Sequence, residues 1–186
     1  MDGRRERRVD IKIDDMDLKI IRILQNNGRE KLVDIGKKVG LTHPTVKERI
    51  GRLIESGLVK IQANLNIRAI NYIVGFIGLE VIDPTVVQFL VENLAKCPRV
   101  LLIGYGSGDY NMFLVLIAPD VETLSGFIEN NLRRIDAVRK ISFSIGNIYY
   151  PDFLPARVVE EKECLKVCEE CEFKNVLRIC PGCRPE

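Results

Sequence analysis

Residues 32–54 have the spacing of a helix-turn-helix, and this constrains the fold of the chain more than any other feature of its sequence. Gly36, Gly40 and Val46 stand where such a motif needs a small residue, a turn glycine and a buried aliphatic side chain. Glycine allows two helices to cross closely and permits the sharp turn between them. The spacing therefore predicts two short helices, of which the second has one buried side and one side available to a partner.

A further helix and a hairpin are predicted on either side of this motif. Asp14 is a good N-cap for a helix that ends at about Asn26-Asn27-Gly28, and the acidic residues after Asp14 are favourable in a first turn. The second helix covers about Lys31–Val39, and Thr42 caps the third, which runs to about residue 56. Leu58–Ile67 is predicted to be a β-hairpin, the wing of a winged helix-turn-helix.

The third helix has the properties of a DNA-recognition helix. Its apolar positions form a stripe that we expect to be buried: Val46, Ile50, Leu53 and Ile54. Residues near the N-terminus of a recognition helix reach base edges, and basic residues further along meet phosphates. We therefore predict that DNA is contacted by Thr42, that bases are read by His43, Thr45, Lys47 and Glu48, and that phosphates are met by Arg49 and Arg52. The alternative is a helical hairpin within a larger core.

The distribution of charge supports the DNA-binding interpretation. Residues 1–60 carry 15 Lys and Arg against 10 Asp and Glu, whereas residues 61–186 carry 13 against 16, although the net charge of the whole chain is only +2. A basic front half is typical of a nucleic-acid-binding module fused to another domain. For Arg4, Arg5, Arg7 and Arg8 alone, a solvated tail is an equally good explanation.

After residue 70 the pattern becomes one of alternating strands and helices. Strand-like runs cover 72–82, 100–105, 110–118 and 141–145, and in the last of these Ile141, Phe143 and Ile145 alternate with serines as in a half-buried strand. Two helices begin after Asp83 and Asp120, and Gly106-Ser107-Gly108 forms the turn between the middle strands. The order predicts a ferredoxin-like βαββαβ domain, so the fold class is α+β.

The ordered combination of these motifs resembles the Lrp/AsnC (leucine-responsive/feast-famine) family of transcription regulators. The similar stretches span about residues 14–150 and are Asp14–Ile21, Asp34–Gly36 with Gly40–Thr42, Val46–Leu53 with Gly57–Lys60, and Gly104–Tyr110. The resemblance implies a winged-helix domain joined to a sensor domain whose sheets pair into dimers and often octamers. It also implies that small effectors, usually amino acids, bind between protomers near the loop after the second strand.

Carried over to this chain, the effector-binding residues implied by the resemblance are Gly104, Gly106, Ser107, Gly108, Asp109 and Tyr110. Asn111 stands where the family often has a second acid, so the identity of the effector does not follow from the resemblance. On turn chemistry alone, Gly106–Asp109 is equally well explained as a simple hairpin turn.

Five of the six cysteines lie in the last 23 residues and include two C-x-x-C pairs. Two such turns complete a tetrahedral thiolate site without histidine, and a bound metal would stabilise a tail too short to bury a core. We predict zinc held by Cys168, Cys171, Cys180 and Cys183, with Cys164 spare. An iron–sulfur cluster that also uses Cys164 is the rival, and a disordered or disulfide-linked tail is the third alternative. Cys97, at a helix end, is expected to be structural.

The chain is thus divided into a basic arm (1–13), a winged helix-turn-helix (14–70), a ferredoxin-like effector-sensing and dimerisation domain (71–150) and a cysteine-rich tail (151–186). Its apolar runs are too short to span a bilayer and no apolar signal region follows the first arginines, so a cytoplasmic protein without membrane contact is expected.

The predicted function is sequence-specific regulation of transcription by a homodimer or higher homo-oligomer, with double-stranded DNA and a small effector as partners and without enzymatic activity. One alternative is an enzyme similar to the sirohaem decarboxylases, which share this architecture. The only histidine, His43, lies on the recognition helix and not in a catalytic site. The other alternative, a redox or metal scaffold that does not bind DNA, leaves the helix-turn-helix spacing unexplained.

Overall fold

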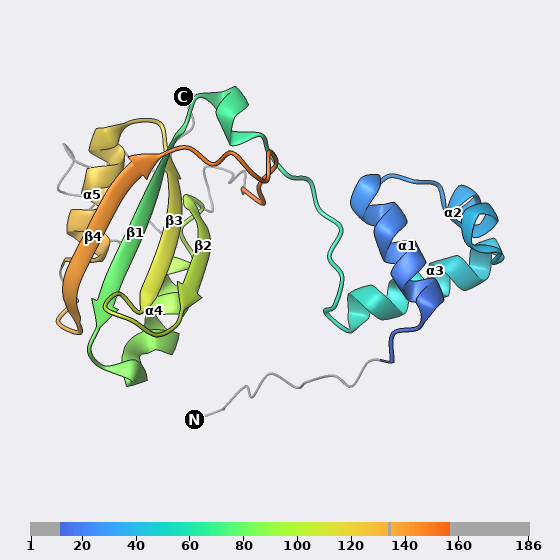
Figure 1. The fold of residues 1–186 in the computed structure, drawn as a ribbon, viewed down its shortest axis with the longest axis horizontal. Coiled ribbons are helices and arrows are strands. Elements are labelled where there is room, and N and C mark those ends of the chain that lie inside the picture. Colours follow the sequence, from blue (N-terminus) through green and yellow to red (C-terminus); the bar gives the residue numbers. More distant parts are fainter. Residues whose placement is uncertain (1–11, 134, 157–186) are drawn as a thin grey trace. The chain divides into compact units, whose positions relative to one another are not determined.

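The computed structural model describes residues 12–133 and 135–156 of the 186-residue chain. The chain divides between Ala63 and Asn64 into two units, which we name the helical unit and the sheet unit (Figure 1). The four arginines of the N-terminal arm and the cysteines of the tail lie outside the described residues. The division falls before the predicted boundary at residue 70, because Ile67 is buried against Val74 and Ile117 of the sheet unit.

Three helices form the helical unit, as predicted: α1 (Asp15–Asn26), α2 (Leu32–Val39) and α3 (His43–Glu55). Asp14 caps α1 in a capping box, in which its carboxylate accepts from the Asp17 N–H at 2.8 Å and the Asp17 carboxylate accepts from the Asp14 N–H at 3.2 Å. The buried core of the unit consists of Ile20, Ile35, Val39, Val46 and Ile50.

The turn between α2 and α3 requires both of its predicted glycines. Gly40 has a φ of +73°, in the left-handed region that favours glycine. A Cβ atom on Gly36 would lie 2.5 Å from the carbonyl oxygen of Leu41, and the Leu41 N–H donates to the Gly36 oxygen at 2.9 Å. Gly36 is therefore needed mainly for the close return of the turn and less for the crossing of the two helices.

The hairpin predicted over Leu58–Ile67 is not formed. Within the described residues no strand lies between α3 and the short 3-10 helix η1 (Ile67–Ile70), so the helical unit has no wing built from its own chain. Leu65 instead exchanges two backbone hydrogen bonds with Leu154, of 2.8 and 2.9 Å. The apolar pattern of this segment predicts extended backbone, but it does not identify the strand with which that backbone pairs.

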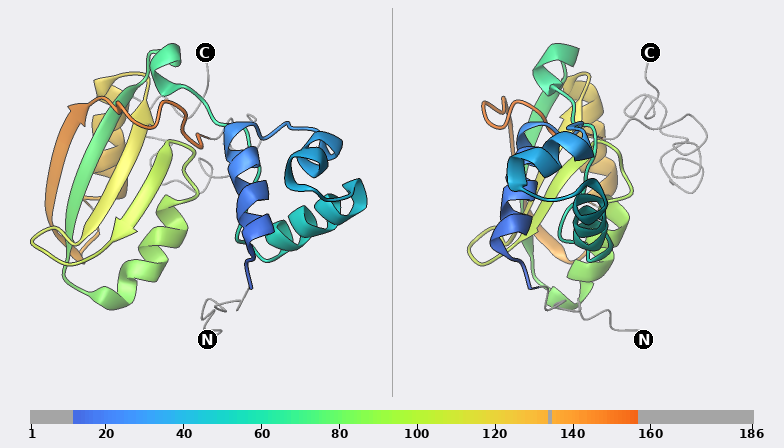
Figure 2. Two further views of the ribbon diagram at one scale, coloured as in Figure 1. Left: turned by 45° about the vertical axis from the view of Figure 1, so that its right-hand side comes forward. Right: turned by 90° about the vertical axis from the view of Figure 1, so that its right-hand side faces the viewer.

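The sheet unit has the predicted βαββαβ order, and its elements are β1 (Ile73–Val81), η2 (Pro84–Val86), α4 (Val87–Leu94), β2 (Val100–Tyr105), β3 (Met112–Ala118), α5 (Val121–Asn131) and β4 (Val138–Gly146). The strands are antiparallel in the order β2-β3-β1-β4. Figures 1 and 2 show α4 and α5 on one face of this sheet. The main core lies between this face and the two helices, and Cys97 packs against it as the sequence predicts.

The edge position of β4 leaves its apolar side chains less buried than predicted. Phe143 and Ile145 pair with Ile77 and Gly75 and therefore point to the helix-covered face, yet they are 36% and 45% exposed. At the edge of a sheet one flank has no neighbouring strand to cover it, so alternation alone overestimates burial.

The other face of the sheet, which we name the open face, is only partly covered. At one end, η1 and residues 148–156 pack over Val74 and Ile117. Elsewhere on this face Phe76, Leu102 and Phe113 are 37%, 53% and 46% exposed. No helix among the described residues has the length and apolar character needed to cross a membrane.

Candidate nucleic-acid interface and effector loop

The predicted base-reading side of α3 is open to solvent. His43, Lys47 and Glu48 are exposed, and Thr45 is half-buried. Thr42 occupies the predicted N-cap position, but its side chain does not accept a hydrogen bond from the backbone of α3. Its hydroxyl group instead forms a hydrogen bond of 2.8 Å with the hydroxyl group of Thr45. Each of the five residues therefore lies at the start of α3, where side chains can reach a groove.

The buried side of α3 is narrower than the predicted stripe. Val46, Ile50 and Leu53 are buried, but Ile54 is 43% exposed. Ile54 lies at the end of the helix, next to Leu53, so it points away from the core that Leu53 enters. The other two helices of the unit are short, so they bury only three apolar side chains of α3 and leave Ile54 partly exposed.

The two arginines predicted to meet phosphates form ion pairs with Asp14 and Asp17 at the start of α1. Arg49 Nη1 lies 2.7 Å from a carboxylate oxygen of Asp14 and 2.8 Å from one of Asp17, and Arg52 Nη2 lies 2.5 Å from the other oxygen of Asp17. The Arg49 side chain is 25% exposed and that of Arg52 is 50% exposed. The sequence predicts that both arginines meet phosphates, but it does not show that both long side chains fold back onto α1.

Asp17 forms a buried cluster with these arginines that the sequence analysis does not predict. Its side chain is fully buried at N3 of α1, where the sequence predicts only a favourable charge at a helix start. The hydrogen bond from the Asp17 N–H, followed by the bond from Arg49, holds the pKa of Asp14 below its usual value, and these carboxylates raise the pKa of Arg49. The sequence contains a signal for this cluster: Asp14 and Asp17 are three residues apart at the start of one helix, and two arginines are three residues apart on another helix.

The predicted effector loop joins β2 and β3 through residues 106–111. The Gly106 N–H donates to the Asn111 carbonyl oxygen at 2.8 Å, and Gly108 has a φ of +126°. Gly106, Ser107, Gly108 and Asp109 are exposed, whereas Gly104 lies within β2. The loop thus offers backbone groups and one carboxylate to a ligand.

Tyr110 and Asn111 anchor the end of this loop to β1. A Cβ atom on Gly78 would lie 3.2 Å from Tyr110 Cγ, so the tyrosine packs directly over that glycine. The Asn111 amide accepts from the Val81 N–H and donates to the Val81 carbonyl oxygen, both at 2.8 Å. Asn111 therefore fixes the base of the loop, a task in which an acid cannot supply the donated bond.

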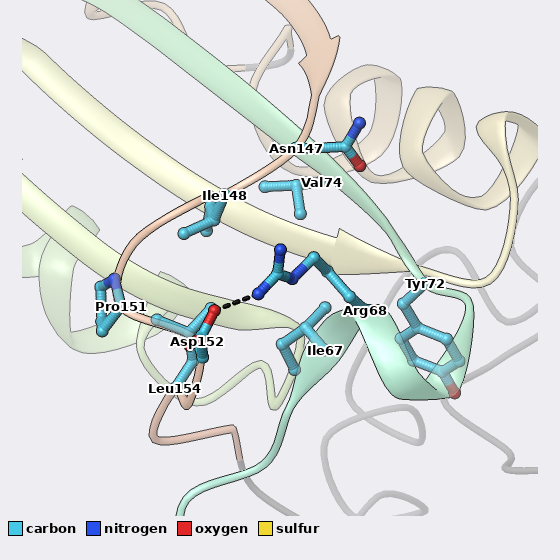
Figure 3. A pocket seen from close by; sticks show the side chains of 9 residues that line it. All are labelled: Ile67, Arg68, Tyr72, Val74, Asn147, Ile148, Pro151, Asp152 and Leu154. Carbon is cyan, nitrogen blue, oxygen red and sulfur yellow. Dashed lines mark hydrogen bonds and ion pairs between the residues drawn. The ribbon is translucent and has the colours of Figure 1, made fainter.

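A small pocket lies elsewhere in the sheet unit, between η1 and the segment after β4 (Figure 3). Ile67, Val74 and Leu154 form its apolar wall, and an ion pair between Arg68 and Asp152 closes one side. This pocket was not predicted, because its two halves are far apart in the sequence.

The described residues contain no group of three or more His, Cys, Asp or Glu side chains that could hold a metal. The predicted ligands Cys168, Cys171, Cys180 and Cys183, and the spare Cys164, lie outside the described part of the chain. The zinc site therefore stays a prediction.

Two family models match the chain, one for each unit. The model of the AsnC-type helix-turn-helix domain matches residues 13–54, and that of the Lrp/AsnC ligand-binding domain matches residues 75–146. An HTH-type transcriptional regulator of Pyrococcus abyssi is 33% identical over 137 residues, covering 73% of this chain and 86% of the relative. The HTH-type transcriptional regulator FL11 of Pyrococcus furiosus is 36% identical over 119 residues, covering 63% and 78%.

Solved structures show the same fold. AsnC of E. coli superposes with a TM-score of 0.65 at 18% identity, covering 81% of this chain and 99% of that protein. An AsnC family transcriptional regulator from Agrobacterium tumefaciens gives a TM-score of 0.63 at 25% identity, covering 72% and 90%. The regulator NMB0573 of Neisseria meningitidis, solved as a complex with L-Met, gives 0.66 at 21% identity, covering 81% and 99%.

Proposed function

Because this chain belongs to the Lrp/AsnC family of transcription regulators, we propose that it works in the cytoplasm as a homodimer that reads specific DNA sites with the N-terminal part of α3. The observation that carries the proposal is the exposed side of this helix, held outward by a turn that depends on Gly36 and Gly40. The base-reading residues we propose are His43, Thr45, Lys47 and Glu48, with Thr42 as a further DNA contact. The curated relatives and structural neighbours are regulators, so the enzymatic alternative is not supported.

The test is the binding of duplexes selected from genomic fragments. We expect Lys47→Ala to weaken specific binding by about 1–3 kcal/mol, the range for a good base contact, in a fluorescence anisotropy titration. Lys19→Ala is the charge-matched control, because Lys19 is exposed on α1 and outside the recognition helix. Equal affinity of the wild type for selected and random duplexes at about 150–200 mM salt would contradict sequence-specific binding.

We further propose that two protomers pair through the open face. Phe76, Leu102 and Phe113 leave exposed apolar side chains there, and nothing lies within 4 Å of the Cβ position of Gly104, so a second sheet can approach at that glycine. A second copy of the chain suits this surface because its own open face exposes the same apolar side chains, as a two-fold interface requires.

A matched pair of charge substitutions tests the dimer. We expect Phe113→Glu to give monomers in sedimentation velocity, because it buries a carboxylate between two apolar faces. Phe89→Glu is the control, since Phe89 is 65% exposed on α4 behind the sheet. A dimer that survives Phe113→Glu would place the interface elsewhere.

For the effector we propose an amino acid bound at the β2–β3 loop, by Gly104, Gly106, Ser107, Gly108, Asp109 and Tyr110. The exposed carboxylate of Asp109 suits an ammonium group, and the backbone N–H groups of the glycine turn suit a carboxylate. The solved relative in complex with L-Met makes methionine the first compound to test. We expect a thermal shift with one of the twenty amino acids that is lost in Asp109→Asn; no shift with any of them would exclude this class of effector.

We also propose that Cys168, Cys171, Cys180 and Cys183 bind one zinc ion. The support is their two C-x-x-C pairs, separated by eight residues. Metal analysis of protein purified without air or chelator should give one zinc per chain, and the variant with all four cysteines replaced by serine should give none. Iron with a visible absorbance band would favour the cluster that also uses Cys164, and sub-stoichiometric metal of any kind would remove the proposal.

A further inference from the structure

Asp17 binds the two arginines that the recognition helix carries. Its buried carboxylate accepts from Arg49 Nη1 at 2.8 Å, from Arg52 Nη2 at 2.5 Å and from the Asp14 N–H at 3.2 Å. Lys47, by contrast, makes no ion pair with any other described residue. The cations of α3 are therefore divided into one that is presented outward and two that are held by the same carboxylate.

This division matters because non-specific DNA binding is almost entirely electrostatic. Each cation that meets a phosphate releases counterions, and the slope of log K against log salt changes by about 0.9 for each such contact on duplex DNA. Arg49 and Arg52 lie on the side of α3 that the sequence predicts to face phosphates, and their side chains are 25% and 50% exposed. Without Asp17, Arg52 would lose its ion-pair partner, and Arg49 would keep only Asp14, at 2.7 Å.

We infer that Asp17 is a positioning residue that determines specificity: it holds Arg52 alone and Arg49 together with Asp14, withholds these cations from the DNA backbone and so lowers the affinity for random sequence. The inference rests on the proposal that α3 is the recognition helix. It is an alternative to the prediction that these arginines meet phosphates. It attributes part of the preference for specific over random DNA to a residue that does not itself touch DNA.

The substitution that tests this is Asp17→Asn, which keeps the shape of the side chain and an acceptor for the Asp14 N–H while removing the charge. In the full chain, anisotropy titrations with selected and random duplexes between about 50 and 300 mM salt should show tighter binding of random DNA. The slope should be steeper by about 1, because Arg52 is released while Arg49 keeps Asp14. The ratio of specific to random affinity should fall. Thermal melting reports the folded fraction.

Arg52→Gln separates this role from a purely structural one. With Asp17 in place, Arg52→Gln should leave the salt slope unchanged, since Arg52 is not on phosphate. In the Asp17→Asn background it should lower the slope by about 1, which gives a double-mutant cycle with a non-zero coupling.

Several outcomes would overturn the inference. The inference is wrong if Asp17→Asn leaves both the salt slope and the ratio of specific to random affinity unchanged. It is also wrong if this substitution weakens specific and random binding in equal proportion. If Asp17→Asn fails to fold, Arg52→Gln alone still decides, because a slope reduced by about 1 in the otherwise unchanged chain would show that Arg52 already meets phosphate. Failure of the proposed function is distinct from these results, since the wild type itself would then not discriminate between duplexes.

Discussion

At the scale of single residues, two glycines of the helical unit occupy opposite environments. A Cβ atom on Gly36 would lie 2.5 Å from the Leu41 carbonyl oxygen, which is backbone and cannot swing away. Gly51, within α3, has nothing within 4 Å of its Cβ position. The first glycine is a requirement of the fold, whereas the second only lowers the helix propensity of α3.

We predict opposite effects on stability for alanine at these positions. Gly36→Ala should lower the free energy of unfolding of the helical unit by about 1–3 kcal/mol, the usual cost of overpacking. Gly51→Ala should raise it by up to about 1 kcal/mol, the difference in helix propensity. Urea denaturation followed by circular dichroism measures both, and effects of the same sign would contradict the distinction.

Asn111 gives a second prediction at this scale. Asn111→Asp removes the bond donated to the Val81 carbonyl oxygen and places a carboxylate beside it, so we expect a loss of about 1–3 kcal/mol in the stability of the sheet unit. Asn93→Asp is the control, because the Asn93 amide donates to the Phe89 carbonyl oxygen at an exposed position. If both variants lose the same free energy of unfolding in chemical denaturation, the Asn111 hydrogen bonds contribute no more to stability than the exposed Asn93 hydrogen bond does.

At the scale of elements, the starts of three helices are capped by aspartates whose pKa values lie below the usual value. In Asp14 and Asp120 the main cause is the hydrogen bond from a backbone N–H, and in Asp83 it is the bond from the Thr85 hydroxyl. A carboxyl with a lowered folded-state pKa is protonated more easily in the unfolded chain. Its contribution is present above the unfolded pKa of about 4 and is lost as the pH falls through the lower folded value.

We therefore predict that the melting temperature falls as the pH is lowered below about 4. Asp120→Asn should make this dependence shallower, because asparagine is also a good N-cap but does not titrate in this range. Calorimetric scans from about pH 6 to pH 3 measure the slope. If the melting temperatures of the wild type and of Asp120→Asn fall in parallel as the pH is lowered, Asp120 does not contribute to the pH dependence of stability.

The elements also show how far sequence reasoning reaches. The helices and strands follow from local periodicity and capping, so α1, with Asp14 as its cap, and β1 were predictable. The failed hairpin over Leu58–Ile67 and the return of Arg49 and Arg52 to Asp17 both depend on partners distant in the sequence. Periodicity identifies a face or an extended segment, but it does not identify what lies against it.

At the scale of the whole molecule, the sheet unit continues beyond β4. Leu154 and Ala156 pack with Ile67, Val74 and Ile117, and Asp152 pairs with Arg68. The ligand-binding model ends at residue 146, and the sequence placed a boundary at residue 150, because Pro151 and Pro155 suggested a tail. Prolines in the sequence indicate where helices and strands end, but the residues that follow them can still pack against the domain.

This predicts different results for two truncated chains. A chain that ends after Gly146 should melt at a lower temperature, because it exposes the buried Ile67 and Val74 and removes the partner of Leu65. A chain that ends after Ala156 should keep the melting temperature of the sheet unit. Equal melting of both truncated chains in calorimetry would show that residues 147–156 do not stabilise the unit.

The anchoring of Leu65 has a last consequence, for the geometry of operators. Ile61 approaches Gly28 in the helical unit, and Leu65 is fixed to Leu154 in the sheet unit, so residues 62–64 alone connect the two anchors. Four residue steps span at most about 14 Å. In a dimer, so short a tether limits how far apart the two reading helices can lie along the double helix. A few glycine and serine residues inserted after Ala63 should let the protein accept spacers of several lengths.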